Sequence, residues 1–240
     1  MQLILLAAGR GSRLPKQFRS KPKCLVKINR RTILDYNKEF FKLFKKKIIV
    51  SGFKNYKLKK YILSNNFIEV HNKKFQSTNM VASMFKAKNK ITNDVVICYG
   101  DIIFDKSIYQ LLKGEGNIMP VNINWLKLWK TRMNKNEIIN DAEDIKIKNN
   151  KLISIGGKIK KKFPISQYMG IFKLKKKSFF NIYKFFIKNK NSKIDMTNFL
   201  NLCIKNNLLE MHCKNYKKQW FEIDSANDIK STSKILNSVW

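Results

Sequence analysis

The residues best suited to chemistry lie near the start of the chain, in a loop that combines glycines with cationic side chains. An apolar run is followed by Gly9 and Gly11, and Arg13 and Lys23 come next. Glycines let backbone N–H groups approach an anion closely, and such a turn forms a nest for phosphate oxygens. Arg13 and Lys23 add fixed positive charge, which suits a triphosphate. The loop therefore predicts a phosphate-binding site, and the alternative is a solvated basic turn.

Neither of two common phosphate-binding motifs is present in this loop. The Walker pattern G-x-x-x-x-G-K-[ST] is absent, and the dinucleotide fingerprint G-x-G-x-x-G is incomplete. The class of site must therefore be inferred from the whole spacing of the loop.

Two aspartates follow short apolar runs at distant points of the chain. Asp101 comes after Gly100 at the end of a predicted buried strand, and Asp224 ends a second such run before a predicted helix. In open α/β sheets, ligands bind at the carboxyl ends of the strands. Two carboxylates can share one Mg²⁺, with waters and triphosphate oxygens completing the octahedron. Asp101 and Asp224 are therefore predicted to bind Mg²⁺, and the alternative for each is a helix cap.

The elements that must position these residues alternate between strand and helix in the first half of the chain. Apolar runs predict buried strands, and apolar residues at helical spacing predict helices. The predicted strands are 2–7, 47–51, 67–70, 94–99 and 117–123, and the predicted helices are 33–46, 55–65, 79–89 and 105–113. This alternation predicts an α/β fold with a Rossmann-like mixed sheet flanked by helices.

The pattern changes after residue 123. Residues 124–170 combine tryptophans, an acidic patch and short β-like runs, which predicts a small β-rich insertion of hairpins over the sheet. The predicted helices beyond it are 176–190, 195–206 and 226–238, and the predicted strands are 208–213 and 219–223. Because no internal repeat or flexible linker divides the chain, we expect a single domain over residues 1–240.

The composition is strongly basic. There are 50 Lys and Arg residues against 16 Asp and Glu residues, for a net charge of +34. A basic surface attracts phosphates and suits nucleic acid. The lysines are spread along the whole chain, however, and asparagine and isoleucine are also abundant. This distribution favours compositional drift, so we expect no nucleic-acid partner.

The cysteines and histidines argue against several other classes of site. The four cysteines are scattered without zinc spacing, and the two histidines, His71 and His212, are far apart. A disulfide framework is not expected, which fits a reducing cytoplasm. The apolar start lacks the positive n-region of a signal peptide, and no run is long enough to span a membrane. A cytoplasmic location is therefore expected.

Residues 6–14 (LAAGRGSRL) with the later Pro22-Lys23 resemble the signature of the nucleotidyltransferase (NTP-transferase) family, written roughly L-A-A-G-x-G-x-R-L and P-K. The resemblance implies that the loop wraps an NTP and that Arg13 and Lys23 stabilise charge on its phosphates. It also implies metal binding by the two aspartates. The implied nucleotide-binding residues are Leu6, Ala7, Ala8, Gly9, Gly11, Ser12, Gly52, Ser77, Asn79 and Gly100.

Three further segments resemble the phosphocholine cytidylyltransferase-like branch of that family, which includes phosphonate and phosphoglutamine cytidylyltransferases. They are residues 77–80 (STNM), 165–172 (ISQYMGIF) and 220–224 (WFEID). The resemblance covers nearly the whole chain. It implies CTP as the nucleotide and an acceptor of the phosphocholine, aminoalkylphosphonate or phosphoglutamine type.

A small zwitterionic acceptor needs cations for its phosphate or phosphonate, and aromatic or acidic groups for its amine. Arg132 and Lys158 are the predicted ligands of the phosphate end. The side chains predicted to face the other end are Trp125, Trp129, Glu143 and Tyr168. The alternatives are a core role for the two tryptophans and a solvated face for Lys158. The insertion at about 124–170 is expected to cover this acceptor site.

The expected reaction is attack by an acceptor oxygen on the α-phosphorus of the NTP, with pyrophosphate leaving. A phosphomonoester has a second pKa near ~6 and is largely dianionic at neutral pH, so no general base is needed. Catalysis would rest on positioning and on charge stabilisation by Mg²⁺, Arg13 and Lys23.

Three alternatives to this function remain open. A sugar-1-phosphate nucleotidylyltransferase shares the loop and the aspartates. A nucleotide-sugar glycosyltransferase would usually want a D-x-D metal site, which residues 101–103 lack. A basic nucleic-acid-binding protein without catalysis is the alternative from another class. The oligomeric state is left open.

Overall fold

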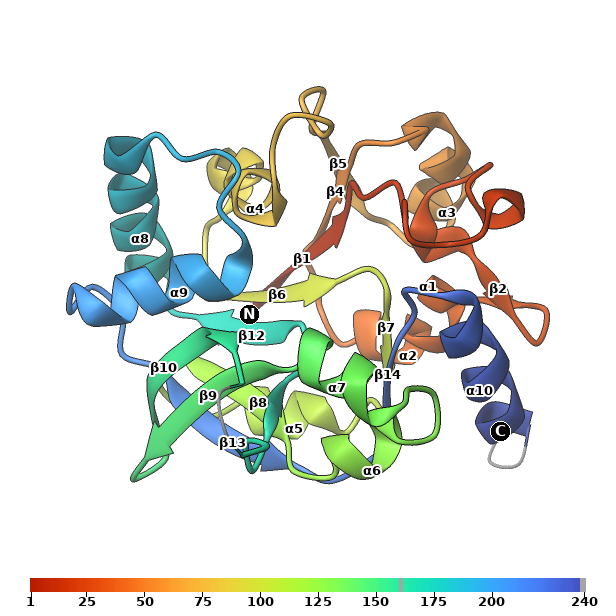
Figure 1. The fold of residues 1–240 in the computed structure, drawn as a ribbon. Coiled ribbons are helices and arrows are strands. Elements are labelled where there is room, and N and C mark those ends of the chain that lie inside the picture. The colour runs from red at the N-terminus through yellow and green to blue at the C-terminus, as the bar shows by residue number, and fades with distance from the viewer. Residues whose placement is uncertain (160–161, 238–240) are drawn as a thin grey trace.

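The centre of the protein is one mixed sheet of ten strands (Figure 1). The computed structural model describes residues 1–159 and 162–237. The strands of this sheet are β1 (Gln2–Ala7), β4 (Lys47–Ser51), β5 (Ile68–His71), β6 (Val95–Tyr99), β8 (Ile118–Asn122), β9 (Glu143–Lys148), β10 (Lys151–Lys158), β11 (Gln167–Tyr168), β12 (Ile171–Leu174) and β13 (His212–Tyr216). Their order is β5-β4-β1-β6-β12-β8-β13-β10-β9, with β11 paired to β8. The predicted mixed α/β architecture is confirmed.

The strands β5, β4, β1 and β6 are parallel neighbours. Every residue of β1 is buried, as expected for a parallel strand with both faces covered. Because parallel strands end at the same edge, the carboxyl ends of β1 and β6 lie side by side. The Gly100 N–H donates to the Leu6 carbonyl at 2.9 Å. This contact brings the glycine-rich loop next to Asp101.

Two small sheets complete the edge where the predicted site residues meet. In one, β7 (Ile102–Phe104) pairs antiparallel with β14 (Trp220–Glu222), and in the other β2 (Lys27–Ile28) pairs with β3 (Arg31–Thr32). The Ile223 N–H donates to the Asp101 carbonyl at 3.0 Å. The pairing of β7 with β14 therefore brings two aspartates together that are far apart in sequence.

Helices cover both faces of the sheet. They are α1 (Ile33–Tyr36), α2 (Lys38–Phe41), α3 (Lys59–Ser64), α4 (Met80–Lys86), α5 (Ile108–Leu112), α6 (Trp125–Trp129), α7 (Lys135–Asp141), α8 (Lys176–Asn189), α9 (Met196–Lys205) and α10 (Ala226–Asn237). Short 3-10 turns span Lys16–Phe18, Lys23–Leu25, Asn55–Leu58 and Lys88–Lys90. In the described part of the chain, no helix has the length and apolar character needed to span a membrane.

Two aromatic clusters join these helices to one another and to β7. Phe40 of α2 makes edge-on ring contacts with Phe104 and with Tyr109 of α5. On the opposite side of the central strands in Figure 1, Phe85 of α4 contacts Phe179 of α8 and Phe199 of α9. Aromatic pairs of this kind add stability beyond the area that they bury.

The helix predicted over 33–46 is interrupted. The structure has α1 and α2, which meet at Asn37. The buried Asn37 side chain donates to the Ile102 carbonyl at 2.6 Å and accepts from the Phe104 N–H at 3.4 Å. These bonds tie the break in the helix to β7. The strand predicted at 208–213 is also shifted and lies at His212–Tyr216.

The segment predicted as an insertion of hairpins has a different structure in its first half. Residues 125–141 form the helices α6 and α7, and β9 and β10 follow as a hairpin with Asn149 and Asn150 at positive φ in its turn. Since β10 pairs with β13, the hairpin extends the main sheet at its edge rather than covering its face. Apolar residues at 125, 126, 128 and 129 have helical spacing, which explains α6.

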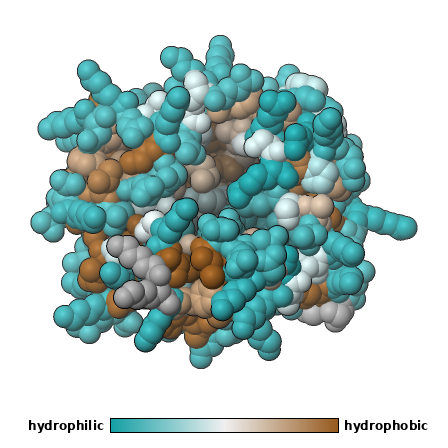
Figure 2. Space-filling view, viewed as in Figure 1, coloured by the Kyte–Doolittle hydropathy of each residue, from teal (hydrophilic) through white to brown (hydrophobic). Residues whose placement is uncertain are grey.

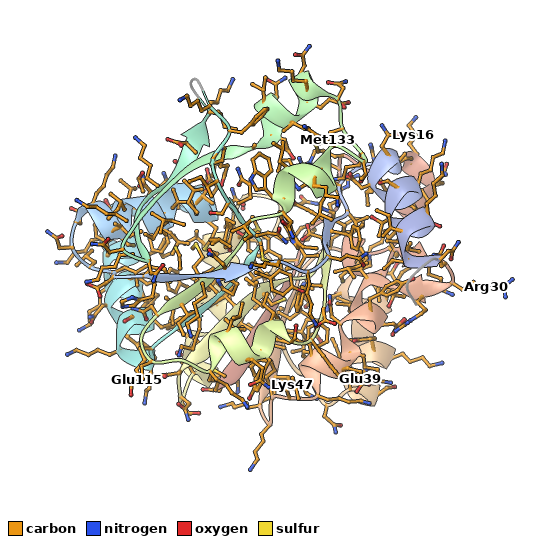
Figure 3. The ribbon with its side chains drawn as sticks, turned by 90° about the horizontal axis from the view of Figure 1, so that it is seen from below. Lys16, Arg30, Glu39, Lys47, Glu115 and Met133 are labelled. Carbon is orange, nitrogen blue, oxygen red and sulfur yellow. The ribbon has the colours of Figure 1, made fainter. Side chains whose placement is uncertain are left out.

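Basic side chains lie on more than one side of the molecule. Figure 3 shows Lys16, Arg30 and Lys47 at separate points on the outer edge of the molecule. This spread agrees with the even distribution of lysines along the sequence.

Candidate active site

The largest hollow at the candidate site is a cavity of about 480 Å³ at the carboxyl ends of β1 and β6. Figure 2 shows the molecule hollowed near the middle of this face. Seven of the predicted nucleotide-binding residues line the cavity, namely Leu6, Ala7, Ala8, Gly9, Ser12, Asn79 and Gly100. Lys23 and Asp101 line it as well, so the loop and the end of β6 share one space.

Three predicted nucleotide-binding residues lie outside the lining of this cavity. A Cβ on Gly52 would lie 2.8 Å from the Ala8 carbonyl oxygen and from the Phe75 Cβ. Gly52 therefore lies behind the wall of the cavity, and its lack of a side chain leaves room for Ala8 and Phe75 to form that wall. Gly11 packs against the side chain of Lys23 in the same supporting way. The Ser77 hydroxyl donates to the Lys74 carbonyl at 3.2 Å.

The glycine-rich loop is attached to the body of the protein by a second, smaller apolar core. Leu14 and Val26 are buried in it, together with Phe221 of β14 and Leu236 of α10. The N-terminal and C-terminal parts of the chain thus hold the loop jointly. This anchoring places the cationic side chains of the loop beside the two aspartates.

Lys23 joins Asp101 and Asp224. Its ammonium lies 2.6 Å from Asp101 Oδ2 and also bonds Asp224 Oδ1, while Arg13 lies 2.8 Å from Asp224 Oδ2. Burial by itself would raise the pKa of Asp224, but attraction to Lys23 and Arg13 outweighs it, so the pKa lies below its usual value. The same pairing raises the pKa of Lys23 despite its burial. Lys23, Arg13 and Asp224 are therefore charged at neutral pH.

The two carboxylates have the chemistry of a hard-cation site. Asp101 Oδ1 is buried and has no hydrogen-bond partner among the described residues, which marks an oxygen free to take a ligand. No cluster of three or more His, Cys, Asp or Glu ligands occurs in the described ranges. A two-carboxylate site fits Mg²⁺, which keeps waters and phosphate oxygens as its remaining ligands.

A second cavity of about 190 Å³ adjoins the first, and Met80 and Tyr99 line both. Asp101 lines the larger cavity and Asp224 the smaller one, so the aspartate pair lies between them. Arg13 also lines the smaller cavity.

Three of the predicted acceptor residues, Trp129, Glu143 and Tyr168, line the second cavity. Glu143 Oε1 accepts from the Thr197 hydroxyl at 2.7 Å. Burial raises the pKa of Glu143, although the Thr197 bond partly opposes this shift.

The other three predicted acceptor residues do not line the second cavity. Trp125 is only 1% exposed, and its indole N–H donates to the Pro164 carbonyl at 3.0 Å, so it belongs to the core. Arg132 is buried in an ion pair with Asp228. Lys158 ends β10 on the surface and does not line the cavity. Trp125 therefore lies in the core and Lys158 on a solvated surface, which were the alternatives for these two residues.

Arg132 affects the site indirectly, through Asp228. Asp228, its partner, accepts from the backbone N–H groups of Asp224 at 2.9 Å and Ser225 at 2.7 Å. This buried pair holds the turn that carries Asp224. The cap of α10 is Ser225, whose hydroxyl accepts from the Asp228 N–H at 3.2 Å, so Asp224 is not the cap.

Several residues of the second cavity were not predicted. They are Tyr99, Asp141, Asp195, Thr197 and Glu222. Asp195 caps α9 by accepting from the Asn198 N–H at 2.8 Å. The sequence therefore offered a helix-cap signal at Asp195 but no signal of a binding site. Burial, reinforced by Asp224 and Asp101, raises the pKa of Glu222 well above its usual value.

Comparison with known proteins agrees with this geometry. The MobA-like NTP transferase domain matches residues 3–117. The chain is 32% identical to CTP:phosphoglutamine cytidylyltransferase of Campylobacter jejuni over 96% of this chain and 98% of that protein. It is 29% identical to the bifunctional protein GlmU of Methanococcus maripaludis, of which it spans 55%.

Solved structures share the fold at low sequence identity. CTP:phosphocholine cytidylyltransferase from Streptococcus pneumoniae superposes with a TM-score of 0.73 at 19% identity, covering 98% of both chains. The inositol-1-phosphate CTP transferase from T. maritima gives 0.77 at 19% identity, covering 100% of this chain and 97% of that one. With the full-length match to the Campylobacter enzyme and the loop, aspartate pair and two cavities described above, this chain belongs to the nucleotidyltransferase family, as an enzyme of its cytidylyltransferase-type branch.

Proposed function

We propose that the enzyme transfers CMP from CTP to a small acceptor that carries a phosphate or phosphonate and a positively charged amine, releasing pyrophosphate. One observation carries the proposal. The pair Asp101 and Asp224, bridged by Lys23, lies between a larger and a smaller cavity. A nucleotide in the larger cavity and an acceptor in the smaller one would meet at this pair.

The larger cavity suits the nucleotide. Its volume of about 480 Å³ lies in the range of small-molecule sites, and backbone at the ends of β1 and β6 lines it. Arg10 and Lys23 supply positive charge for the phosphates. The choice of CTP rests on the similarity to cytidylyltransferases.

The charge of the smaller cavity supports an acceptor with an amine. Five of the sixteen acidic residues of the protein line it, namely Asp141, Glu143, Asp195, Glu222 and Asp224, against Arg13 alone among the basic residues that the structure describes. Burial raises the pKa of Glu222 to about 8, so Glu222 is mostly neutral at pH 7, and the other carboxylates of this wall favour a cation in a protein of net charge +34. The aromatic rings of Trp129 and Tyr168 add cation–π attraction. A hexose-1-phosphate has no positive group for this wall, which argues against the sugar-1-phosphate alternative.

The chain's own groups would orient and neutralise the reactants. The acceptor phosphate would lie at the Arg13 end of the smaller cavity, facing the α-phosphorus. Its oxygen is already largely ionised at neutral pH, because the second pKa of a phosphomonoester is near ~6. Neither His71 nor His212 lines either cavity, and the reaction requires no general base. Asp101 and Asp224 would hold Mg²⁺, which when bound supplies charge stabilisation to the phosphates.

The test is pyrophosphate release with each NTP and a panel of acceptors in the presence of Mg²⁺. The panel contains phosphocholine, 2-aminoethylphosphonate, phosphoglutamine and two hexose-1-phosphates. Release with CTP and one amine-bearing acceptor supports the proposal and identifies the acceptor. Release with hexose-1-phosphates alone would overturn the amine assignment, and release with another NTP alone would overturn CTP.

A further inference from the structure

We infer that Lys23 takes the position of the divalent cation between Asp101 and Asp224 when no nucleotide is bound, so that the cation enters with the nucleotide and not before it. The inference rests on the proposed metal-binding role of these aspartates. It assigns Lys23 two successive partners, first the carboxylates and then the phosphates.

The oxygens that a divalent cation would use are already occupied. Lys23 Nζ contacts Asp101 Oδ2 at 2.6 Å and also Asp224 Oδ1. Arg13 Nη2 contacts the remaining oxygen of Asp224, Oδ2, at 2.8 Å. Of the four carboxylate oxygens, Asp101 Oδ1 alone has no partner among the described residues. One buried oxygen is a poor site for a cation that needs several oxygen ligands.

Charge makes the two occupants exclusive. A divalent cation on the same oxygens would lie within a few ångströms of the Lys23 ammonium. The side chains of Lys23 and Asp224 are each 11% exposed, so water screens this repulsion weakly. The Lys23 ammonium together with Arg13, or a divalent cation by itself, can neutralise the two carboxylates, and all of them together would leave excess positive charge.

A bound nucleotide would draw the Lys23 ammonium away from the two carboxylates. Lys23 lines the larger cavity, so a triphosphate there offers its ammonium a second set of anionic oxygens. The lysine side chain is a flexible stem that carries a compact charge. Transfer of the ammonium to the phosphates returns both carboxylates to the cation. No covalent bond changes in this exchange.

The experiment measures Mn²⁺ binding to the nucleotide-free protein from the electron paramagnetic resonance signal of free Mn²⁺. The variants are Lys23→Met, which removes the charge, and Lys27→Met, which removes an exposed charge from the same segment. We expect Lys23→Met to bind Mn²⁺ about tenfold or more tighter than the wild type, because a like charge beside the site is gone. Lys27→Met should match the wild type.

A second readout guards against misfolding of the variant. Without divalent cation, Lys23→Met should melt at a lower temperature than the wild type, because Asp101 loses its cationic partner and Asp224 keeps only Arg13. Mg²⁺ should restore much of that loss in Lys23→Met and change the wild type little. If Lys23→Met does not fold, Lys23→Gln, which keeps a donor to one carboxylate, takes its place.

The outcomes separate this inference from the proposed function. Equal Mn²⁺ affinity in the wild type and Lys23→Met would overturn the inference. So would Mn²⁺ binding that Asp101→Asn leaves unchanged in the presence of CTP, since the aspartates would then not be the site. Because neither measurement requires an acceptor or turnover, a wrong acceptor assignment would leave the result intact.

Discussion

The guanidinium of Arg132 and the carboxylate of Asp228 form an ion pair in the interior, where their side chains are 4% and 1% exposed. The guanidinium also lies 4.8 Å from the ring centroid of Trp129, which lines the smaller cavity. Asp228 in turn binds the backbone of the turn that carries Asp224. A buried charge pair therefore supports both the proposed metal site and the wall of the proposed acceptor cavity.

Arg132→Met should destabilise the protein by about 3–5 kcal/mol, because it leaves the Asp228 charge buried without a partner. Urea denaturation followed by circular dichroism measures the change. The exposed Lys130 lies in the same segment, and Lys130→Met should stay within about 0.5 kcal/mol of the wild type. A selective rise in the acceptor KM with stability unchanged would instead restore Arg132 as a direct acceptor ligand.

Asp101→Asn should reduce kcat by about a thousandfold or more, because loss of a metal-binding carboxylate removes several kcal/mol of charge stabilisation. The assay is pyrophosphate release at saturating substrates and Mg²⁺. Asp105 pairs with Lys218 at the surface, so Asp105→Asn is the matched control and should keep near-native turnover. Near-native turnover of Asp101→Asn would remove Asp101 from the proposed metal site.

Acceptor binding should weaken as the pH falls through the pKa of Glu143. Burial raises that pKa, with Asp195 and Asp141 adding to the shift, so the carboxylate is protonated at a higher pH than an ordinary glutamate. A protonated Glu143 no longer attracts an ammonium. The acceptor KM should therefore begin to rise at a higher pH than the usual pKa of a glutamate would predict.

Glu143→Gln isolates this effect, because titration of the acceptor phosphate is common to both proteins. At neutral pH the variant should raise the acceptor KM about tenfold and leave the KM for CTP unchanged, as expected for one charge-assisted contact. The ratio of the two acceptor KM values should approach one at low pH. A ratio that is independent of pH would show that the charge of Glu143 is not used.

Gly170→Ala should disturb both cavities at once. Gly170 has φ of 75°, and a Cβ there would lie 2.8 Å from Cδ2 of Tyr99, whose ring lines both spaces. We expect a loss of about 1–3 kcal/mol in stability and a fall in kcat/KM for both substrates.

Gly157→Ala is the control for backbone strain alone. Gly157 has φ of 83°, but nothing lies within 4 Å of the position of its Cβ. It should therefore cost stability without loss of activity in the folded protein. Equal loss of activity in both variants would mean that the Tyr99 contact does not matter for the site.

Much of the lining of the larger cavity was predictable from the sequence. Residues 6–14 are contiguous, and a loop that follows a buried first strand lies at the carboxyl edge of an α/β sheet, where ligands bind. Asp101 could be placed at the same edge for the same reason. Its pairing with Asp224 depends on β7 and β14, whose contact spans more than 100 residues.

The acceptor side was only half predictable. Trp125 and Trp129 have the same residue type and lie one helical turn apart, yet one lines the cavity and the other is in the core. Arg132 was predicted as a phosphate ligand because it is cationic, but its partner Asp228 comes from a helix 96 residues away. The acidic residues of the cavity come from α7, β9, α9 and β14 and the segments beside them, and no local pattern joins them.

The sequence by itself determined most of the strands and helices up to residue 123 and the residues of the glycine-rich loop, because strand and helix periodicity and a contiguous loop are local properties of the chain. The tertiary structure alone decided which charges are partners. Lys23 could have pointed to solvent, but the pairing of β7 with β14 and the packing of Leu14 under α10 bring it between two carboxylates. Burial and distance set the strength of such interactions, and both are fixed only once distant segments are packed together.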